Sequence, residues 1–281
     1  MADECQKGAF SREDSPFSKK TKPFTKKTSP YSKKAKPFTR KTSPFSKKKT
    51  KISNLVAHWP FDDNLDTANV IDTKDNYNGT LSDGDNNYTS DHHVEGKVGT
   101  GALEFDGDND YINLGDITEL NSVSEFSIGM WVNQDVLGQT DYLFNKKKDS
   151  DNLITIYTVT GSIICQVGSV AVAYGAIPNT NIAPAGSWHH LVYTYNGAGT
   201  GNAGRLKVYV DGVQKTLGFG RTIPATTADL SGYDATIGKS VGSWDGKIDE
   251  VSIFSKELTQ AEVDALTPFR FTRKIKTTLL V

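Results

Sequence analysis

The sequence predicts an all-β, two-sheet antiparallel sandwich that follows a long, extended, basic N-terminal arm. From residue 54 onward, short runs rich in Val, Ile, Tyr, Phe and Trp alternate with Gly, Asn and Asp clusters. Before residue 53, proline recurs every seventh residue, which excludes a helix. The last residues are basic again. We therefore divide the chain into an arm (1–52), a β-sandwich (53–267) and a basic tail (268–281).

The arm consists of five copies of one seven-residue phrase. The copies read SPFSKKT, KPFTKKT, SPYSKKA, KPFTRKT and SPFSKKK. Proline favours β or polyproline II backbone, and the units are too polar to bury a core of their own, so we expect an extended arm. We expect it to dock on a protein partner through its aromatic and basic side chains. These are Phe17, Phe24, Tyr31, Phe38, Phe45, Lys19, Lys20, Lys26, Lys27, Lys33, Lys34, Arg40 and Lys41.

Charge is distributed very unevenly along the chain. Residues 1–52 hold 16 Lys and Arg but 4 Asp and Glu, whereas residues 53–267 carry a net charge of −17. This asymmetry indicates that the arm seeks an acidic partner. Three interpretations stay open: a solubilising linker, a nucleic-acid-binding segment whose aromatics stack on bases, and a segment that docks into a protein assembly.

The targeting features and the cysteine count indicate in which cellular compartment the protein is made. The N-terminus lacks an apolar core, so we expect no secretion signal, and no run of 18 apolar residues predicts a membrane span. Two cysteines cannot form a disulfide framework. We therefore expect assembly in a host cytoplasm.

Within the sandwich, local patterns define several elements. Apolar residues alternate cleanly along two segments: Phe126, Ile128, Met130 and Val132, and Leu206, Val208 and Val210. Asp211-Gly212 predicts a tight hairpin turn. The segment 258–266 is the one with a helical pattern, with Thr259 as the N-cap and Glu262 completing a capping box.

Several motifs in a fixed order resemble a known family. The motifs are HWPFDDN, GALEFDGDNDYINL, FSIGMWV, SWHHLVYTYNG, RLKVYVDGV, IGKS and GKIDEVSIFSKELTQAEVDAL. Over residues 54–266 this order resembles the laminin-G-like, concanavalin-A-like jelly roll. The resemblance implies a non-catalytic module that binds glycans or proteins. Members also occur in virion and adhesin proteins and as appendages of glycosidases.

The resemblance further implies a structural Ca²⁺ ion, since many laminin-G-like domains hold one. The expected ligands are Asp62, Asp63, Asp106 and Asp249. Relatives that cleave β-glucans carry Glu-x-Asp-x-x-Glu on one strand, because glycoside hydrolysis needs paired carboxylates. That string is absent here, so we expect no enzyme. Glycan contact would need aromatic side chains in loop or edge positions, for which the candidates are Tyr88, Tyr174, Tyr233 and Trp244.

Together these features predict a virion structural protein, of a bacteriophage. In this interpretation the arm docks on other virion subunits, and many copies of the sandwich serve as a capsid or tail decoration or fibre that contacts a cell-surface glycan or receptor. Two alternatives are a carbohydrate-binding, lectin-like module outside a virion and a nucleic-acid-binding protein that uses the basic arm.

Overall fold

The computed structural model describes residues 52–82, 89–136, 139–177 and 185–267. All of them belong to one unit of the chain, Lys48–Val281. The arm residues expected to dock on a partner, the basic tail and Tyr88 lie outside the described residues.

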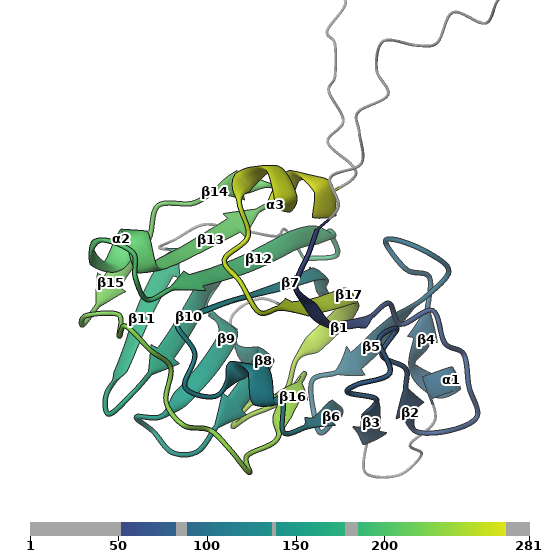
Figure 1. The fold of residues 1–281 in the computed structure, drawn as a ribbon. Helices are drawn as coiled ribbons and strands as arrows, with labels where there is room; N and C mark the ends of the chain where they lie inside the picture. Colours follow the sequence, from purple (N-terminus) through teal and green to yellow (C-terminus); the bar gives the residue numbers. More distant parts are fainter. Residues whose placement is uncertain (1–51, 83–88, 137–138, 178–184, 268–281) are drawn as a thin grey trace, which may run out of the picture. The chain divides into compact units, whose positions relative to one another are not determined.

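Two antiparallel sheets stack to form a sandwich, as the sequence predicts (Figure 1). Sheet 1 contains, in spatial order, β14 (Val213–Gln214), β13 (Leu206–Val210), β12 (His189–Asn196), β7 (Glu125–Gln134), β17 (Asp245–Phe254), β5 (Ala102–Asp106) and β4 (His93–Val94), with β1 (Leu55–Trp59) also paired to β17. Sheet 2 contains β15 (Gly218–Gly220), β11 (Val172–Ile177), β10 (Ser162–Gly168), β9 (Leu153–Val159), β8 (Thr140–Lys147), β16 (Ala235–Ile237), β6 (Tyr111–Gly115), β3 (Gly79–Ser82) and β2 (Asn69–Val70).

The core lies between the two sheets and is filled by one side of every long strand. The alternating residues predicted in β7 and β13 are all buried in it. Trp59 and Trp244 are the largest fully buried side chains. Cys165 of β10 is a free, buried thiol, and burial raises its pKa, so it packs as a small apolar group.

The predicted hairpin turn is confirmed. Asp211 and Gly212 join β13 to β14, and both have positive φ angles, 53° and 74°. Two consecutive residues with positive φ are what a tight hairpin requires. Glycine tolerates this backbone without a steric cost, which explains its place at the second position.

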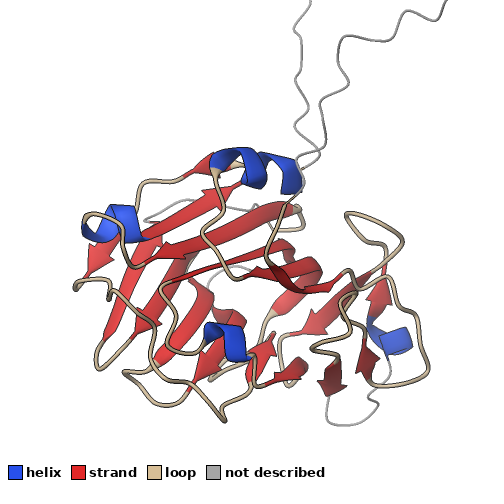
Figure 2. Ribbon diagram, viewed as in Figure 1, coloured by secondary structure: helices blue, strands red, loops and turns tan. Residues whose placement is uncertain are grey.

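Helices are few and lie outside the strands (Figure 2). Those among the described residues are α1 (Thr89–His92), η1 (Thr118–Leu120), α2 (Gly201–Arg205) and α3 (Gln260–Leu266). None of those in the described ranges has the length and apolar character that a membrane crossing demands.

The last helix packs on part of the outer face of sheet 1. The predicted capping box at the start of α3 is confirmed, since Thr259 caps the helix and the Glu262 side chain binds the Thr259 amide in return. Leu258 and Val263 pack on Val192, Tyr209 and Phe254. Beside the helix, sheet 1 also carries a pocket of about 190 Å³, lined by residues that include His58, Trp131 and Glu250.

Candidate functional site

A row of polar side chains crosses the outer face of sheet 2. Each member lies directly opposite the next one on the neighbouring strand, from β11 through β10, β9, β8 and β16 to β6. We call this set the polar row. Its members are Tyr174, Gln166, Thr155, Asn145, Thr236 and Asn113.

Strand geometry places the whole polar row on one face. Residues directly opposite each other on paired strands project their side chains to the same side of the sheet. Neighbouring strands lie about 4.8 Å apart, so five steps give a row of roughly 24 Å. One bond within the row joins the Thr155 hydroxyl to the Asn145 side-chain oxygen, at 3.2 Å. Thr155 itself is buried, so the groups that the polar row offers to a ligand are those of its other five members.

Two stacked tyrosines lie beside the polar row. Tyr142 of β8 is opposite Tyr157 of β9, and their ring centroids are 5.1 Å apart at an interplanar angle of 23°. The Gln166 amide donates to the Tyr157 hydroxyl at 3.4 Å, which ties the pair to the row. Burial raises the pKa of both tyrosines, so both keep their hydroxyl protons at neutral pH. We call Tyr142 and Tyr157 the tyrosine pair.

Tyr174 stands at one end of the row and is its aromatic member. It is 40% exposed, and it lies opposite Gly220 of the edge strand β15. A Cβ atom at residue 220 would lie 2.3 Å from two atoms of the Tyr174 ring. Only glycine leaves room for the ring in this position, which fixes how Tyr174 is presented.

A basic pocket adjoins the other end of the row. Its volume is about 390 Å³, and we call it the lysine pocket. Its lining residues are Tyr111, Asn145, Lys147, Lys148, Thr236, Lys239, Ser240 and Val241. Asn145 and Thr236 belong to both the pocket and the polar row, so the two are continuous. The Lys239 ammonium lies 5.1 Å from the centre of the Tyr111 ring, within the range of a cation–π contact.

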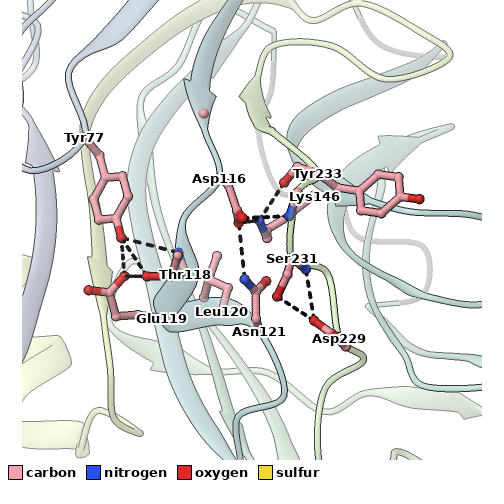
Figure 3. A network of polar contacts seen from close by, with 12 residues as sticks. Tyr77, Asp116, Thr118, Glu119, Leu120, Asn121, Lys146, Asp229, Ser231 and Tyr233 are labelled. Atoms are coloured by element: carbon pink, nitrogen blue, oxygen red, sulfur yellow. Dashed lines mark hydrogen bonds and ion pairs between the residues drawn. The ribbon is translucent and has the colours of Figure 1, made fainter.

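A buried ion pair fixes the loop beside this pocket. Figure 3 shows Lys146 directed toward Asp116 and the backbone of Tyr233. The fully buried Lys146 ammonium donates to the Asp116 carboxylate at 2.5 Å and to the Tyr233 carbonyl at 2.6 Å. The Gly232 amide donates to the same carboxylate at 2.7 Å. This network holds Tyr233 where its ring faces the Lys148 ammonium, 6.0 Å away.

The structure separates the four predicted glycan-contact residues. Tyr174 belongs to the polar row, and Tyr233 lies beside the lysine pocket. The prediction for Trp244 is wrong, since its side chain is fully buried in the core and has no face to offer a ligand. Tyr88 lies outside the described residues.

Sequence reasoning missed the tyrosine pair and Gln166. The pattern that could have found them is the alternation within DYLFNKK, LITIYTV and SIICQVG. There, Tyr142, Tyr157 and Gln166 occupy the positions that face away from the apolar core. In a strand with one buried face, large aromatic or amide side chains on the other face indicate a binding surface.

The four aspartates expected to bind Ca²⁺ all accept hydrogen bonds from backbone amides. Asp62 accepts from Thr100 and Gly101, Asp63 from Ile71, and Asp106 from Asp108. Asp249 accepts from Lys97 and Val98. Across the described ranges, no group of three His, Cys, Asp or Glu side chains is arranged to hold a metal ion. The four aspartates are therefore not gathered into one carboxylate cluster, and a structural Ca²⁺ held by single carboxylates and carbonyls stays a prediction.

Known proteins share this fold. Residues 106–264, more than half of the chain, match the family model described as the concanavalin A-like lectin/glucanases superfamily. No curated protein sequence is similar enough to count as a match.

Solved structures with the same fold include domain 4 of the extracellular arabinanase AbnA from Geobacillus stearothermophilus, in complex with arabinotriose. It is 25% identical, with a TM-score of 0.59 over 76% of this chain and 98% of that domain. The receptor-binding domain of the botulinum neurotoxin C/D mosaic serotype is 14% identical, with a TM-score of 0.54 over 78% of this chain. The serotype D ligand-binding domain in complex with N-acetylneuraminic acid gives the same values. This chain spans about half of those toxin domains, as their covered share is 52%.

Proposed function

The chain belongs to the concanavalin A-like lectin/glucanase superfamily, and from that premise we propose that it binds glycan chains on the outer face of sheet 2. The observation that carries the proposal is the continuous polar row with the tyrosine pair beside it. The similar arabinanase domain, whose structure contains arabinotriose, supports a carbohydrate ligand.

The chemistry of the row suits sugars. A sugar ring has C–H groups on its faces and hydroxyls around its edge. Tyrosine rings offer flat apolar area with a polar tip, and they lose little conformational freedom on binding. Side-chain amides such as those of Gln166 and Asn145 both donate and accept, so each can pair with a hydroxyl in either role. An oligosaccharide lying along the row would use both kinds of contact.

We propose further that the binding is non-catalytic. Glycoside hydrolysis needs two carboxylates that flank the scissile bond. Strands β8, β9, β10 and β11 carry a single carboxylate, Asp141. Its side chain is buried and accepts a hydrogen bond from Gln134 at 2.6 Å. The surface that would hold the glycan therefore offers no acid–base pair within these strands.

Replacing Tyr174 tests the proposal. The full-length protein should bind at least one oligosaccharide on an array that includes arabino-oligosaccharides and acidic polysaccharides. Tyr174→Ala should weaken that binding about tenfold or more, because truncating an exposed aromatic residue that contacts the ligand can cost more than 1.4 kcal/mol. Val213→Ala, at an exposed residue of β14 in sheet 1, should bind like the wild type. Equal binding by both variants, or no binding by the wild type, would refute the proposal.

Gly220→Ala provides a second test that keeps every ligand-contacting side chain. The new methyl group collides with the far end of the Tyr174 ring and moves it off β15. The ring can turn toward solvent, so we expect the melting temperature to change by no more than a few degrees while glycan affinity falls severalfold. Thermal unfolding and isothermal titration calorimetry would measure the two effects. Unchanged affinity would mean that the ring position does not matter.

A virion role is the second candidate function, and the arm sequence favours it. Five basic repeats, each with one aromatic residue, suit a peptide that docks on many copies of a capsid or tail subunit. We propose that the sandwich is then the part that contacts a cell-surface glycan. Full-length protein should copurify with a virion subunit after nuclease treatment, and replacing the five repeat aromatics with alanine should abolish this. Loss on nuclease treatment would favour the nucleic-acid alternative instead.

A further inference from the structure

The lysine pocket is a local concentration of positive charge on an acidic domain. Residues 53–267 have a net charge of −17 and contain twelve Lys and Arg. Three of the twelve, Lys147, Lys148 and Lys239, line this one pocket. Placing three ammonium groups together raises the electrostatic free energy of the folded protein, because like charges repel at short distance. A bound anion would lower it.

None of these three lysines has a carboxylate within ion-pair distance in the described part of the chain, although the positive charge of Lys148 helps to lower the pKa of Asp149 and of Asp229. Lys146, Lys207, Lys247 and Lys256 each form an ion pair with Asp or Glu. In those ranges, no ion pair is formed by any lysine that lines the pocket. Lys239 instead lies over Tyr111 and donates weakly to the Asn109 carbonyl, at 3.4 Å.

The acids near the pocket are already engaged. Asp149 accepts hydrogen bonds from Asp151 and Asn152 in its own turn, and Asp234 accepts from Asn113 at 2.9 Å. The pocket also holds groups that can share an anion with the lysines, since Thr236 and Ser240 line it together with Asn145. The pocket therefore has cationic donors, neutral donors and open volume, and it begins where the polar row ends.

We propose that the preferred ligand is an acidic glycan whose carboxylate or sulfate lies in the lysine pocket while its neighbouring sugar rings lie along the polar row. This inference rests on the proposed glycan function and specifies its substrate class. Lys147 and Lys239 are the residues that select the charged group. Ammonium groups bind such anions through charge-assisted hydrogen bonds, which are stronger than neutral ones. Neutral glycans would occupy the row alone and bind more weakly.

The test compares three probes on full-length protein: oligogalacturonate, its methyl-esterified form and an oligosaccharide from a sulfated galactan. Methyl esterification removes the charge and keeps the sugar rings. We expect wild-type affinity for oligogalacturonate or for the sulfated probe to exceed that for the methyl ester at least about tenfold. The stronger of the two charged probes identifies carboxylate or sulfate as the anion.

The decisive variant is the double substitution Lys147→Gln with Lys239→Gln. Its affinity for the charged probes should fall about tenfold, so that the preference for them is lost. Its affinity for the methyl ester should equal that of the wild type. A control with the same net charge is Lys74→Gln with Lys215→Gln, at two lysines outside the pocket. Since all variants keep the basic arm, its contribution is common to them, and measurement at about 0.15 M salt limits it.

The outcomes separate the two proposals. If the pocket variant and the charge-matched control behave alike while Tyr174→Ala still weakens the methyl ester, the acidic-glycan inference is wrong and the glycan site survives. If Tyr174→Ala changes nothing on any probe, or no probe binds, both proposals fail. The inference is supported if the pocket variant loses its preference for the charged probes, the charge-matched control keeps it, and Tyr174→Ala weakens binding of every probe.

Discussion

Asp116→Ala should lower the free energy of unfolding by about 3 kcal/mol, because it leaves a buried ammonium without its counter-charge. The Lys146 side chain is fully buried, whereas that of Asp116 is 28% exposed, so we expect the low end of the range for buried pairs. Burial opposes ionisation of Asp116, but hydrogen bonds from Lys146, Gly232 and Asn121 hold its pKa below the ordinary value. The carboxylate is thus charged at neutral pH.

A rescue variant distinguishes a lost charge pair from lost packing. Lys146→Met in the Asp116→Ala background removes the stranded ammonium and keeps an apolar stem of similar length. Replacement of a buried ion pair by apolar residues is often neutral. We therefore expect the double variant to recover most of the stability in urea denaturation, although the Tyr233 carbonyl loses its donor. If the double variant is less stable than Asp116→Ala, the ion pair is not the cause.

Asp249 should make the stability of the wild type fall as pH rises from about 4 to about 7. Burial raises the pKa of this carboxyl to about 7, and the negative charge of Glu250 adds to the effect. Its Oδ2 atom accepts from the Lys97 and Val98 amides at 2.8 and 2.9 Å. Its Oδ1 atom is buried without a hydrogen bond in the described part of the chain. Ionisation places a charge where solvent cannot reach it.

The sign follows from proton binding. The folded state holds the Asp249 proton up to about pH 7, whereas the unfolded chain releases it near pH 3.8. Between these values the folded state binds more protons, so folding becomes less favourable as pH rises. A shift of this size costs about 2.5 kcal/mol between roughly pH 5 and pH 8. Above pH 7 the cost no longer grows.

Asp249→Asn measures this contribution directly. The amide oxygen can still accept from both backbone amides, but the side chain does not titrate. Chemical denaturation should find that the stability of the variant relative to the wild type rises by about 2.5 kcal/mol between pH 5 and pH 8. Asp108→Asn, at an exposed residue, is the matched control. Parallel pH profiles for wild type and Asp249→Asn would contradict the assignment.

The candidate site could be predicted only in part. Tyr174 is recognisable because an aromatic residue stands in the short, Gly-flanked strand VAYGAI. Its neighbours in the polar row are not recognisable, because β16 lies between β8 and β6 and pairs residues about 90 and 120 positions apart. Nothing local in the sequence states which strands become neighbours, and a binding surface built across strands depends on that order.

The sequence also did not indicate which polar and aromatic side chains are buried. Lys146 stands in the run Lys146-Lys147-Lys148, yet it is fully buried while Lys147 is exposed. Strand alternation turns the two side chains to opposite faces, and Asp116 from a distant loop makes burial of the ammonium tolerable. Trp244 shows the reverse case, since a Gly-Ser context that suggests a loop delivers the side chain into the core.

The sequence by itself determined the class of fold, the alternation of β7 and β13, the Asp211-Gly212 hairpin and the capped helix α3. Each depends on contacts within a few residues, where backbone preferences and periodicity act directly. Only the tertiary structure decided which side chains share the outer face of sheet 2, which lysine is buried and where the aspartates bind. Those properties arise from pairing between distant strands, whose register is set by burial of the whole core and not by local preference.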